Sequence, residues 1–323
     1  MMKYLFFDTE SSNCFNNMYK MCEWGSLLTD EAFNVFPRTK MDVLINPGRD
    51  GKFNLTGRKG GRDLVLAHSE AEYKAARLFK DHYDNIKFFL SQKDALIFLW
   101  ASENDIQALL DQCVRYGLPM ISFVSYDVQM LFKKAFPETP GMSGLESAMK
   151  LLNLDTDGIK AHRPDDDSLM TSMVLKRLCE KSGKTVRELI EDCPKCKMES
   201  ISTYKDMKAR HEANLERKRL EEGRKKVLKP YLDELNVIFN HGYPKDTPNE
   251  RIFCTSRCFR EHIDETLEKI KQWINRGFFL GKTSDAKYFV CYDSADKERL
   301  AANPDFANME FVSADEFDAL TDN

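Results

Sequence analysis

The sequence contains no long hydrophobic run, and its 323 residues carry a formal net charge of only −4. A membrane-spanning helix needs about 20 consecutive apolar residues, so we expect no such helix and no membrane partner. The N-terminus does not resemble a signal peptide, because acidic residues follow after only a few apolar ones. The small negative charge excludes nucleic-acid binding by bulk charge, so any such contact must come from local basic patches.

Cysteine is present in an odd number, nine residues. Without a secretion signal, this count favours reduced thiols and a cytoplasmic location. Two pairs, Cys193-x-x-Cys196 and Cys254-x-x-x-Cys258, could supply one structural zinc site. The interval between the pairs is long, however, and burial of Cys254 as a small apolar side chain explains its position more simply. Zinc is therefore the weaker of the two interpretations.

The glycine-rich segment 57–62 lacks the Gly-Lys-Ser/Thr ending of a nucleotide-binding P-loop, which excludes that motif. Its basic side chains could meet phosphates, but an ordinary solvated loop is the favoured interpretation.

A chain of this length is expected to form about two domains. Up to residue 182, three strands with short links predict an antiparallel start, and residues 11–17 between the first two predict a polar loop. The later strand–helix–strand–helix order predicts an α/β layer. A second compact α/β unit is expected over residues 249–323.

Residues 183–248 between these units are dominated by Lys, Arg and Glu. Their thin apolar stripe predicts a charged helical connector, interrupted near Gly223 and Pro230. Its basic residues could contact a nucleic-acid backbone, but a solvated connector stabilised by neighbouring ion pairs is the favoured interpretation.

The first strand, which begins near Tyr4, ends in acidic residues. Because side chains alternate across a strand, Asp8 and Glu10 share one face and Thr9 points to the other. Two adjacent carboxylates repel each other unless a cation lies between them, and their oxygens suit Mg²⁺ or Mn²⁺. The alternative, which the strand alone favours, is a strand that simply ends in water with polar side chains.

Two later segments also place acidic side chains at the ends of elements. Asp105 follows the buried apolar run 95–100 at the start of a helix, where an aspartate can serve as a cap or lie in a site beyond the strand ends. His162 precedes Pro164, which suits a first helical turn, and three aspartates at 165–167. The helix dipole accounts for the first two aspartates. His162 must lie on the preceding loop to meet Asp167, because residues five apart on one helix point about 140° apart.

These acidic segments resemble a known family. Asp8-x-Glu10, Asp105 and His162-x-x-x-x-Asp167 match, in order and spacing, the DEDDh 3′–5′ exonucleases of the RNase H-like fold, including proofreading-subunit-like exonucleases of polymerase III. The amino-acid sequences of residues 7–11, 100–109 and 162–168 are similar to the three motifs of that family. The resemblance implies an RNase H-like exonuclease domain with a mixed sheet over residues 1–182.

The resemblance also implies a mechanism that uses two divalent cations, Mg²⁺ or Mn²⁺, about 3.5–4 Å apart. The residues expected to hold them are Asp8, Glu10, Asp105 and Asp167. Glu10 would also orient the attacking water, and His162 would accept its proton. Thr9 and Ser11, beside the acids, are candidates for substrate contact.

The implied substrate is the 3′ end of a single-stranded nucleic acid, with DNA in repair or replication as the first expectation and a nucleoside 5′-monophosphate as the product. An RNA-trimming enzyme of the same fold is an alternative. A catalytically inactive scaffold is a third, which the intact set of repelling carboxylates argues against.

Residues 249–323 resemble a BRCT domain in the expected order strand–helix–strand–strand–helix–strand–helix. Gly277 after the first helix fits this family, and Phe317 stands where the last helix usually carries an aromatic residue. The resemblance implies a module that binds a protein partner or a DNA end. Ser256 and Lys297 lie near the expected phosphate pocket, but the usual Ser/Thr-Gly is lacking, so phosphate binding is not predicted.

Overall fold

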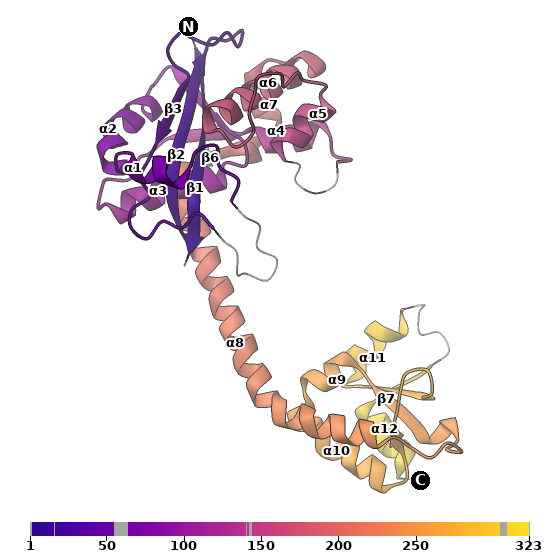
Figure 1. The fold of residues 1–323 in the computed structure, drawn as a ribbon. Coiled ribbons are helices and arrows are strands. Elements are labelled where there is room, and N and C mark those ends of the chain that lie inside the picture. The colour runs from indigo at the N-terminus through magenta and orange to yellow at the C-terminus, as the bar shows by residue number, and fades with distance from the viewer. Residues whose placement is uncertain are drawn as a thin grey trace. The chain divides into compact units, whose positions relative to one another are not determined.

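The computed structural model describes residues 2–15, 17–54, 64–139, 141, 144–303 and 309–322. The chain forms two compact units, residues 1–212 and 213–323 (Figure 1). The glycine-rich segment 57–62 lies outside the described residues. Within the described parts of the chain, every helix is too short or too polar to cross a bilayer.

A six-stranded mixed sheet, in the order β3-β2-β1-β4-β5-β6, forms the centre of the first unit. Its strands are β1 (Lys3–Phe15), β2 (Met18–Thr29), β3 (Met41–Leu44), β4 (Ala95–Leu99), β5 (Val124–Asp127) and β6 (Lys197–Glu199). The first three strands are antiparallel, β4 and β5 continue parallel to β1, and β6 is antiparallel to β5. The predicted α/β class, mixed sheet and antiparallel start are confirmed.

The hairpin of β1 and β2 is longer than predicted. The expected polar loop at residues 11–17 is wrong, because β1 continues to Phe15 and β2 begins at Met18. The register between the strands shifts after Glu10 and again after Ser11. Such irregularities let a strand bend and re-aim its side chains without leaving the sheet. Here they begin where the apolar part of β1 gives way to acidic residues.

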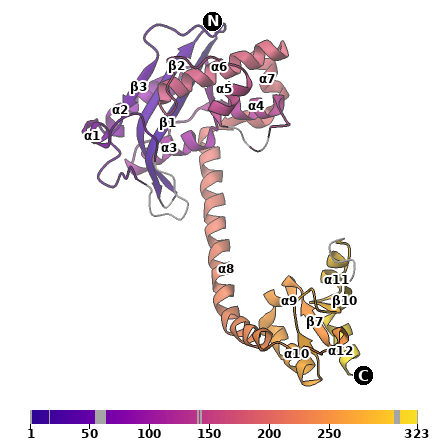
Figure 2. The same ribbon diagram turned by 45° about the vertical axis from the view of Figure 1, so that its right-hand side comes forward.

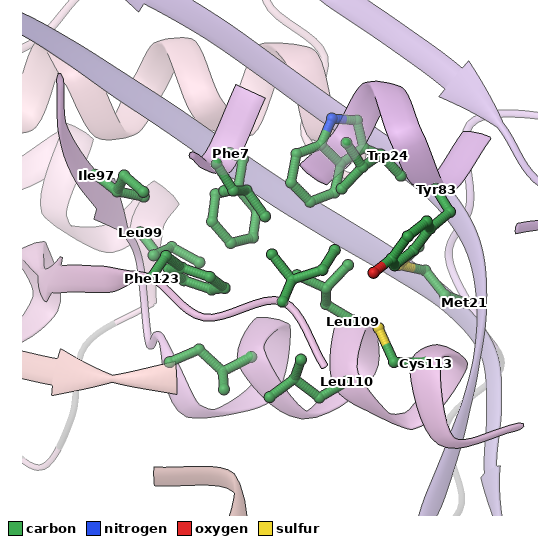
Figure 3. Close-up of a cluster of buried hydrophobic side chains, with 14 of the residues drawn as sticks. Phe7, Met21, Trp24, Tyr83, Ile97, Leu99, Leu109, Leu110, Cys113 and Phe123 are labelled. Atoms are coloured by element: carbon green, nitrogen blue, oxygen red, sulfur yellow. The ribbon is translucent and has the colours of Figure 1, made fainter. Parts of the chain in front are cut away.

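Helices cover both faces of this sheet (Figures 1 and 2). The helices of the first unit are α1 (Glu70–Ala75), α2 (Phe79–Leu90), α3 (Glu103–Arg115), α4 (Val128–Ala135), α5 (Leu145–Leu151), α6 (Pro164–Ser182) and α7 (Val186–Asp192). Phe7 packs in a core with residues of α2 and α3 (Figure 3), whereas Phe6 packs in a core with residues of α4 and α6. Alternation along β1 therefore directs Asp8 and Glu10 to the α6 side.

The N-terminus of α6 lies directly on β2 at Gly25. A Cβ at this position would be 2.0 Å from both Asp165 N and Pro164 C, so only glycine permits the contact. Pro164 occupies the first turn of α6, where a missing N–H is tolerated. Gly25 is paired with Asp8 on β1. The close approach therefore brings the first turn of α6 beside the acidic end of β1.

The segment expected as a connector is divided between the two units. Its beginning joins the first unit, where η1 (Pro194–Cys196) leads into β6, which completes the sheet against β5. α8 (Ser200–His241) is one helix, so the predicted interruption near Gly223 and Pro230 is wrong. An interior proline costs a helix about 3 kcal/mol. Leu228 and Leu235 flank Pro230 and are buried in the core of the second unit, and burial contributes about 1.5–3 kcal/mol for each such side chain, which offsets that cost.

The second unit contains a parallel four-stranded sheet in the order β10-β9-β7-β8. Its elements are η2 (Asn249–Arg251), β7 (Ile252–Thr255), α9 (Arg257–Glu261), α10 (Ile263–Asn275), β8 (Phe279–Leu280), β9 (Tyr288–Cys291), α11 (Ser294–Ala301), β10 (Glu310–Ser313) and α12 (Ala314–Thr321). The predicted strands and longer helices lie within one or two residues of these bounds, whereas the short η2 and α9 were not predicted.

The core of the second unit is aromatic. Trp273 of α10 and Phe317 of α12 are fully buried, with ring centroids 4.9 Å apart in an edge-to-face arrangement. Ser256 Oγ donates to Asp296 Oδ2 at 2.5 Å, and Lys297 pairs with Glu316 at 2.7 Å. The polar groups nearest the expected phosphate pocket are thus bonded within the unit.

Candidate active site

A cavity of about 350 Å³ lies where the first turn of α6 meets β1. Five of the residues expected to form the site line it, and they are Asp8, Glu10, Asp105, His162 and Asp167. Thr9 also lines the cavity, whereas Ser11 does not. Segments far apart in the sequence therefore meet at one place.

Three carboxylates gather most tightly in this cavity. Asp8 and Glu10 of β1 and Asp167 of α6 each offer an oxygen, and these oxygens all lie within 4.8 Å of one another. We call these three residues the cavity cluster. Among the described residues, the cavity cluster forms an ion pair with His162 and with no lysine or arginine. The cluster is therefore an excess of negative charge in a partly buried place.

The proton affinities of these acids reflect this crowding. Burial raises the pKa of Asp8 well above its usual value, and the neighbouring charges of Asp105, Asp167 and Glu10 raise it further. Burial, with Glu10 as the next cause, raises the pKa of Asp167 to about 7. Burial also raises the pKa of Glu10, although His162 opposes the shift. Close like charges that are poorly solvated favour protonation unless a cation neutralises them.

Asp105 lies at the edge of this group and is held by Thr9. It is in the first turn of α3, buried, and its Oδ1 accepts hydrogen bonds from Thr9 N at 2.9 Å and Thr9 Oγ1 at 2.7 Å. Burial raises the pKa of Asp105 to about 8, against the lowering effect of these bonds. The hydroxyl of Thr9, expected to touch substrate, is thus engaged in orienting an acid.

His162 lies in the turn before α6, with a left-handed backbone at φ 64°. The backbone N–H of His162 donates to Asp167 Oδ2 at 3.2 Å. The imidazole Nδ1 is 3.7 Å from Glu10 Oε1. Interaction with Glu10 is the main cause that raises the pKa of His162 above 6.5. The side chain of His162 lines the cavity and is 50% exposed. The group is placed to exchange a proton beside the cavity cluster.

The first turn of α6 is anchored by charges that sequence reasoning missed. Lys40 Nζ contacts Asp166 Oδ1 at 2.6 Å and Asp165 Oδ2 at 3.1 Å. Arg163 donates to Asp42 Oδ2 at 3.0 Å. The helix dipole is thus only part of the reason for the run of aspartates, since two of them fix the helix onto the β2–β3 side of the sheet.

Other groups of the region were also missed. The first turn of α5, with Glu146, lines the cavity. Beside the cavity cluster, Glu23, Asp42 and His68 form a second group whose potential ligand atoms lie within 4.8 Å of one another. We call it the Glu23 cluster. An acid inside the apolar run of residues 21–28 was a usable signal for Glu23, whereas nothing in the sequence connects it with His68.

The cysteines considered for zinc lie in different units. None of the nine cysteines, all of which lie in the described residues, forms a disulfide bond. Cys193 precedes η1 and Cys196 is its last residue, both in the first unit, and Cys254 and Cys258 belong to β7 and α9 of the second. Burial raises the pKa of Cys196 to about 12 and that of Cys254 to about 11, which favours protonated thiols. Among the described residues, the groups that could bind a metal ion are the cavity cluster and the Glu23 cluster, and neither includes a cysteine.

A larger cavity, of about 500 Å³, lies between α4 and η1. Its lining is Met130, Lys133, Lys134, Pro137, Asp192, Cys193, Pro194 and Lys195. With a single carboxylate and no histidine, this lining lacks the set of groups that meets in the cavity beside β1.

No protein-family model matches the sequence, and no curated protein matches it. Solved structures similar to the chain include one titled 3′-end specific recognition of histone mRNA stem-loop by 3′-exonuclease, with a TM-score of 0.44 and 12% identity over 55% of this chain and 64% of that one. The nuclease domain of 3′hExo, a DEDDh family member, bound to rAMP, has a TM-score of 0.45 and 13% identity over 55% of this chain and 92% of that one. E. coli Exonuclease I in complex with a dA16 oligonucleotide has a TM-score of 0.44 and 14% identity over 59% and 42%. The chain thus spans less than two thirds of the first structure and of the third.

Proposed function

We propose that this chain is a metal-dependent 3′–5′ exonuclease of the DEDDh type, with its RNase H-like catalytic domain in the first unit. The observation that carries the proposal is the cavity cluster, three carboxylates within 4.8 Å of one another beside an exposed histidine at the mouth of a cavity. A group of acids that raise one another's pKa values is destabilising by itself, and a divalent cation would relieve it.

The donor set fits hard divalent cations. Carboxylate oxygens on two elements, β1 and α6, suit Mg²⁺ or Mn²⁺, which keep several water ligands and need only a few protein oxygens. Asp8, Glu10 and Asp167 would hold the ions, with Asp105 at the edge of the group. Two such ions supply positive charge to the attacking and leaving oxygens of an in-line displacement.

The residues of the chain would perform the proton transfer and positioning. Glu10 lies beside Nδ1 of His162 and favours the tautomer that carries its proton there. Nε2 is then left to accept a proton from the attacking water. The hydrogen bond from the backbone N–H of His162 to Asp167 ties the position of the base to that of the carboxylates. The two bonds from Thr9 fix the carboxylate of Asp105.

The substrate we propose is a single-stranded nucleic acid with a free 3′ end, from which nucleoside 5′-monophosphates are released. DNA in repair or replication stays the first expectation, and RNA is the alternative. For the second unit we propose a BRCT-like module that binds a protein partner or a DNA end. The order of its elements supports this proposal, with α9 inserted before the first long helix.

Asp8→Asn and Asp167→Asn test the proposed activity. Each removes a negative oxygen from the cavity cluster while keeping the shape of the side chain. We expect each to lower the rate by about 10³-fold or more, equivalent to about 4 kcal/mol of transition-state stabilisation. The measurement is stepwise shortening of 5′-labelled DNA and RNA oligonucleotides of one sequence, with Mg²⁺ or Mn²⁺ and with EDTA.

Asp84→Asn, a change at an exposed position of α2, is the matched control and should keep the full rate. The relative rates on DNA and RNA decide the sugar preference. Shortening that continues in both active-site variants, or in EDTA, would contradict the proposal.

A further inference from the structure

The Glu23 cluster has no part in the proposed reaction, yet it collects metal-binding groups from three places. Glu23 lies in β2, Asp42 in β3 and His68 in the segment before α1. His68 Nε2 is 3.5 Å from Asp42 Oδ2 and 4.0 Å from Glu23 Oε1. One imidazole nitrogen and two carboxylates thus point toward one another.

The polar atoms at the centre of this cluster lack hydrogen-bond partners. Glu23 Oε1, Asp42 Oδ1 and His68 Nε2 are all buried atoms without a hydrogen bond. The side chain of Glu23 is 0% exposed, and those of Asp42 and His68 are 18% and 26% exposed. A buried carboxylate oxygen without a partner costs about 1–3 kcal/mol or more. The cluster therefore lacks partners for its buried polar atoms, and a bound ligand would supply them.

The outer contacts of the same residues are satisfied. Tyr73 Oη donates to Glu23 Oε2 at 2.5 Å, and Arg163 donates to Asp42 Oδ2. His68 Nδ1 is 3.6 Å from Glu72 Oε1. This is the arrangement of a metal site, in which groups outside the ligands orient each carboxylate and direct the second imidazole nitrogen. Glu23 Oε1 and His68 Nε2, which have no hydrogen bond, lie 4.0 Å apart, and Asp42 Oδ2 contacts both Arg163 and His68.

We propose that Glu23, Asp42 and His68 bind a divalent metal ion, with zinc as the preferred ion, at a site separate from the cavity cluster. Ligand atoms about 2.1 Å from one tetrahedral zinc lie about 3.4 Å apart, close to the 3.5 and 4.0 Å separations here. A mixed set of imidazole and carboxylate suits zinc better than Mg²⁺. Asp42 Oδ2, the oxygen 3.5 Å from His68 Nε2, would bind the ion while it also accepts from Arg163. The ion would tie β2, β3 and the segment before α1 together.

The test is zinc binding by the full chain in a variant whose cavity cluster is disabled. The double variant Asp8→Asn/Asp167→Asn, freed of metal with EDTA, is dialysed against Zn²⁺ alone, and bound zinc is measured by elemental analysis. We expect one zinc ion per chain. Adding His68→Gln or Glu23→Gln should weaken binding by about 100-fold or more, since even outer contacts of metal ligands are worth 10–100-fold.

His82→Gln, a change of another histidine on α2, is the matched control and should leave zinc binding unchanged. The side chain of His68 is 26% exposed, whereas that of Glu23 is 0% exposed, so His68→Gln keeps the test valid if circular dichroism shows that Glu23→Gln fails to fold. Substitution with Co²⁺ gives a second readout, because the visible spectrum should change when the nitrogen ligand is removed.

Three results would overturn the proposal. One is a double variant that binds no zinc, which would leave a shared proton between Glu23 and Asp42 as the occupant. Another is zinc binding that survives both His68→Gln and Glu23→Gln. The last is binding that is lost instead with Cys196→Ser, which would assign the ion to the cysteines. None of these results bears on exonuclease activity, so this proposal and the proposed function fail separately.

Discussion

The cavity cluster and the Glu23 cluster stand on neighbouring strands of one sheet, but their surroundings differ. Glu10 of β1 is paired directly with Glu23 of β2, so the two clusters share a face of the sheet. The first cluster lines a cavity and is met by the exposed His162. The second is closed in by Tyr73 and Arg163, which bond its outer oxygens.

This difference separates two uses of the same kind of ligand. A site that acts on a substrate must keep room for it and for water. Access to the cavity, together with the imidazole that His68 adds to the carboxylates, therefore distinguishes the two clusters. Exonuclease rate and zinc content are independent measures of them, and the variants below are chosen to move one measure, both, or neither.

His162→Gln should give the largest effect in this comparison, and only on the cavity side. It removes the proposed proton acceptor but no carboxylate, so we expect the rate to fall by about 10²–10⁴-fold. Binding of Mn²⁺ by the cavity cluster and of zinc by the Glu23 cluster, measured by equilibrium dialysis, should persist. Loss of Mn²⁺ binding would instead make His162 a ligand and contradict its assigned role.

The pH profile of the same variant sharpens this assignment. Glu10 chiefly, with Asp167 and Glu146, raises the pKa of His162 above 6.5. A base must be unprotonated to act, so the wild-type rate should rise with pH and level off only above that value. His162→Gln should lose this acidic limb while keeping any later one. An unchanged limb would assign the titration to another group.

Gly25→Ala should affect both clusters. Gly25 is paired with Asp8 on one side and Asp42 on the other. The new Cβ, 2.0 Å from the backbone of α6, would force the helix away by about 1 Å, and a displacement of that size costs about 10²-fold in rate. Overpacking should also lower the free energy of unfolding by about 1–3 kcal/mol. Assays of rate and of urea unfolding measure these two effects, and the zinc content should fall as well, because Asp42 is paired with Gly25.

Gly223→Ala on α8 is the matched control for this change. A Cβ there has no neighbour within 4 Å, so the variant should gain up to about 1 kcal/mol of stability and keep both activities. If Gly25→Ala behaves like this control, the contact between α6 and β2 does not position the site.

Some features of the site could be predicted from the sequence, and others could not. Alternation along β1 placed Asp8 and Glu10 on one face, and the proline at the start of α6 placed His162 on the loop before it. The contact of Lys40 with Asp166 could not be predicted, because the two residues are 126 positions apart and neither stands in a pattern that names its partner. The same holds for the approach of α6 to Gly25.

Errors in the remaining predictions have a common physical cause. The end of β1 was assigned to a loop because its residues are polar, but an irregular ladder with β2 satisfies their backbone groups within the sheet. The continuity of α8 through Pro230 depends on packing in the second unit, which outweighs local helix propensity. Local pattern gave the elements, and tertiary contacts decided where they end.

Tyr73→Phe should give the smallest effect, and only at the Glu23 cluster. It removes the 2.5 Å bond to Glu23 Oε2 but no metal ligand, so zinc affinity should fall by about 10-fold and the free energy of unfolding by about 1–3 kcal/mol. Tyr83→Phe is the control, because it loses a similar bond to Pro119 O at 2.9 Å away from either cluster and should leave zinc binding unchanged. Exonuclease rate should be unaltered in both variants. Equal zinc affinity in the two would remove Tyr73 from the site and leave the orientation of Glu23 to its packing alone.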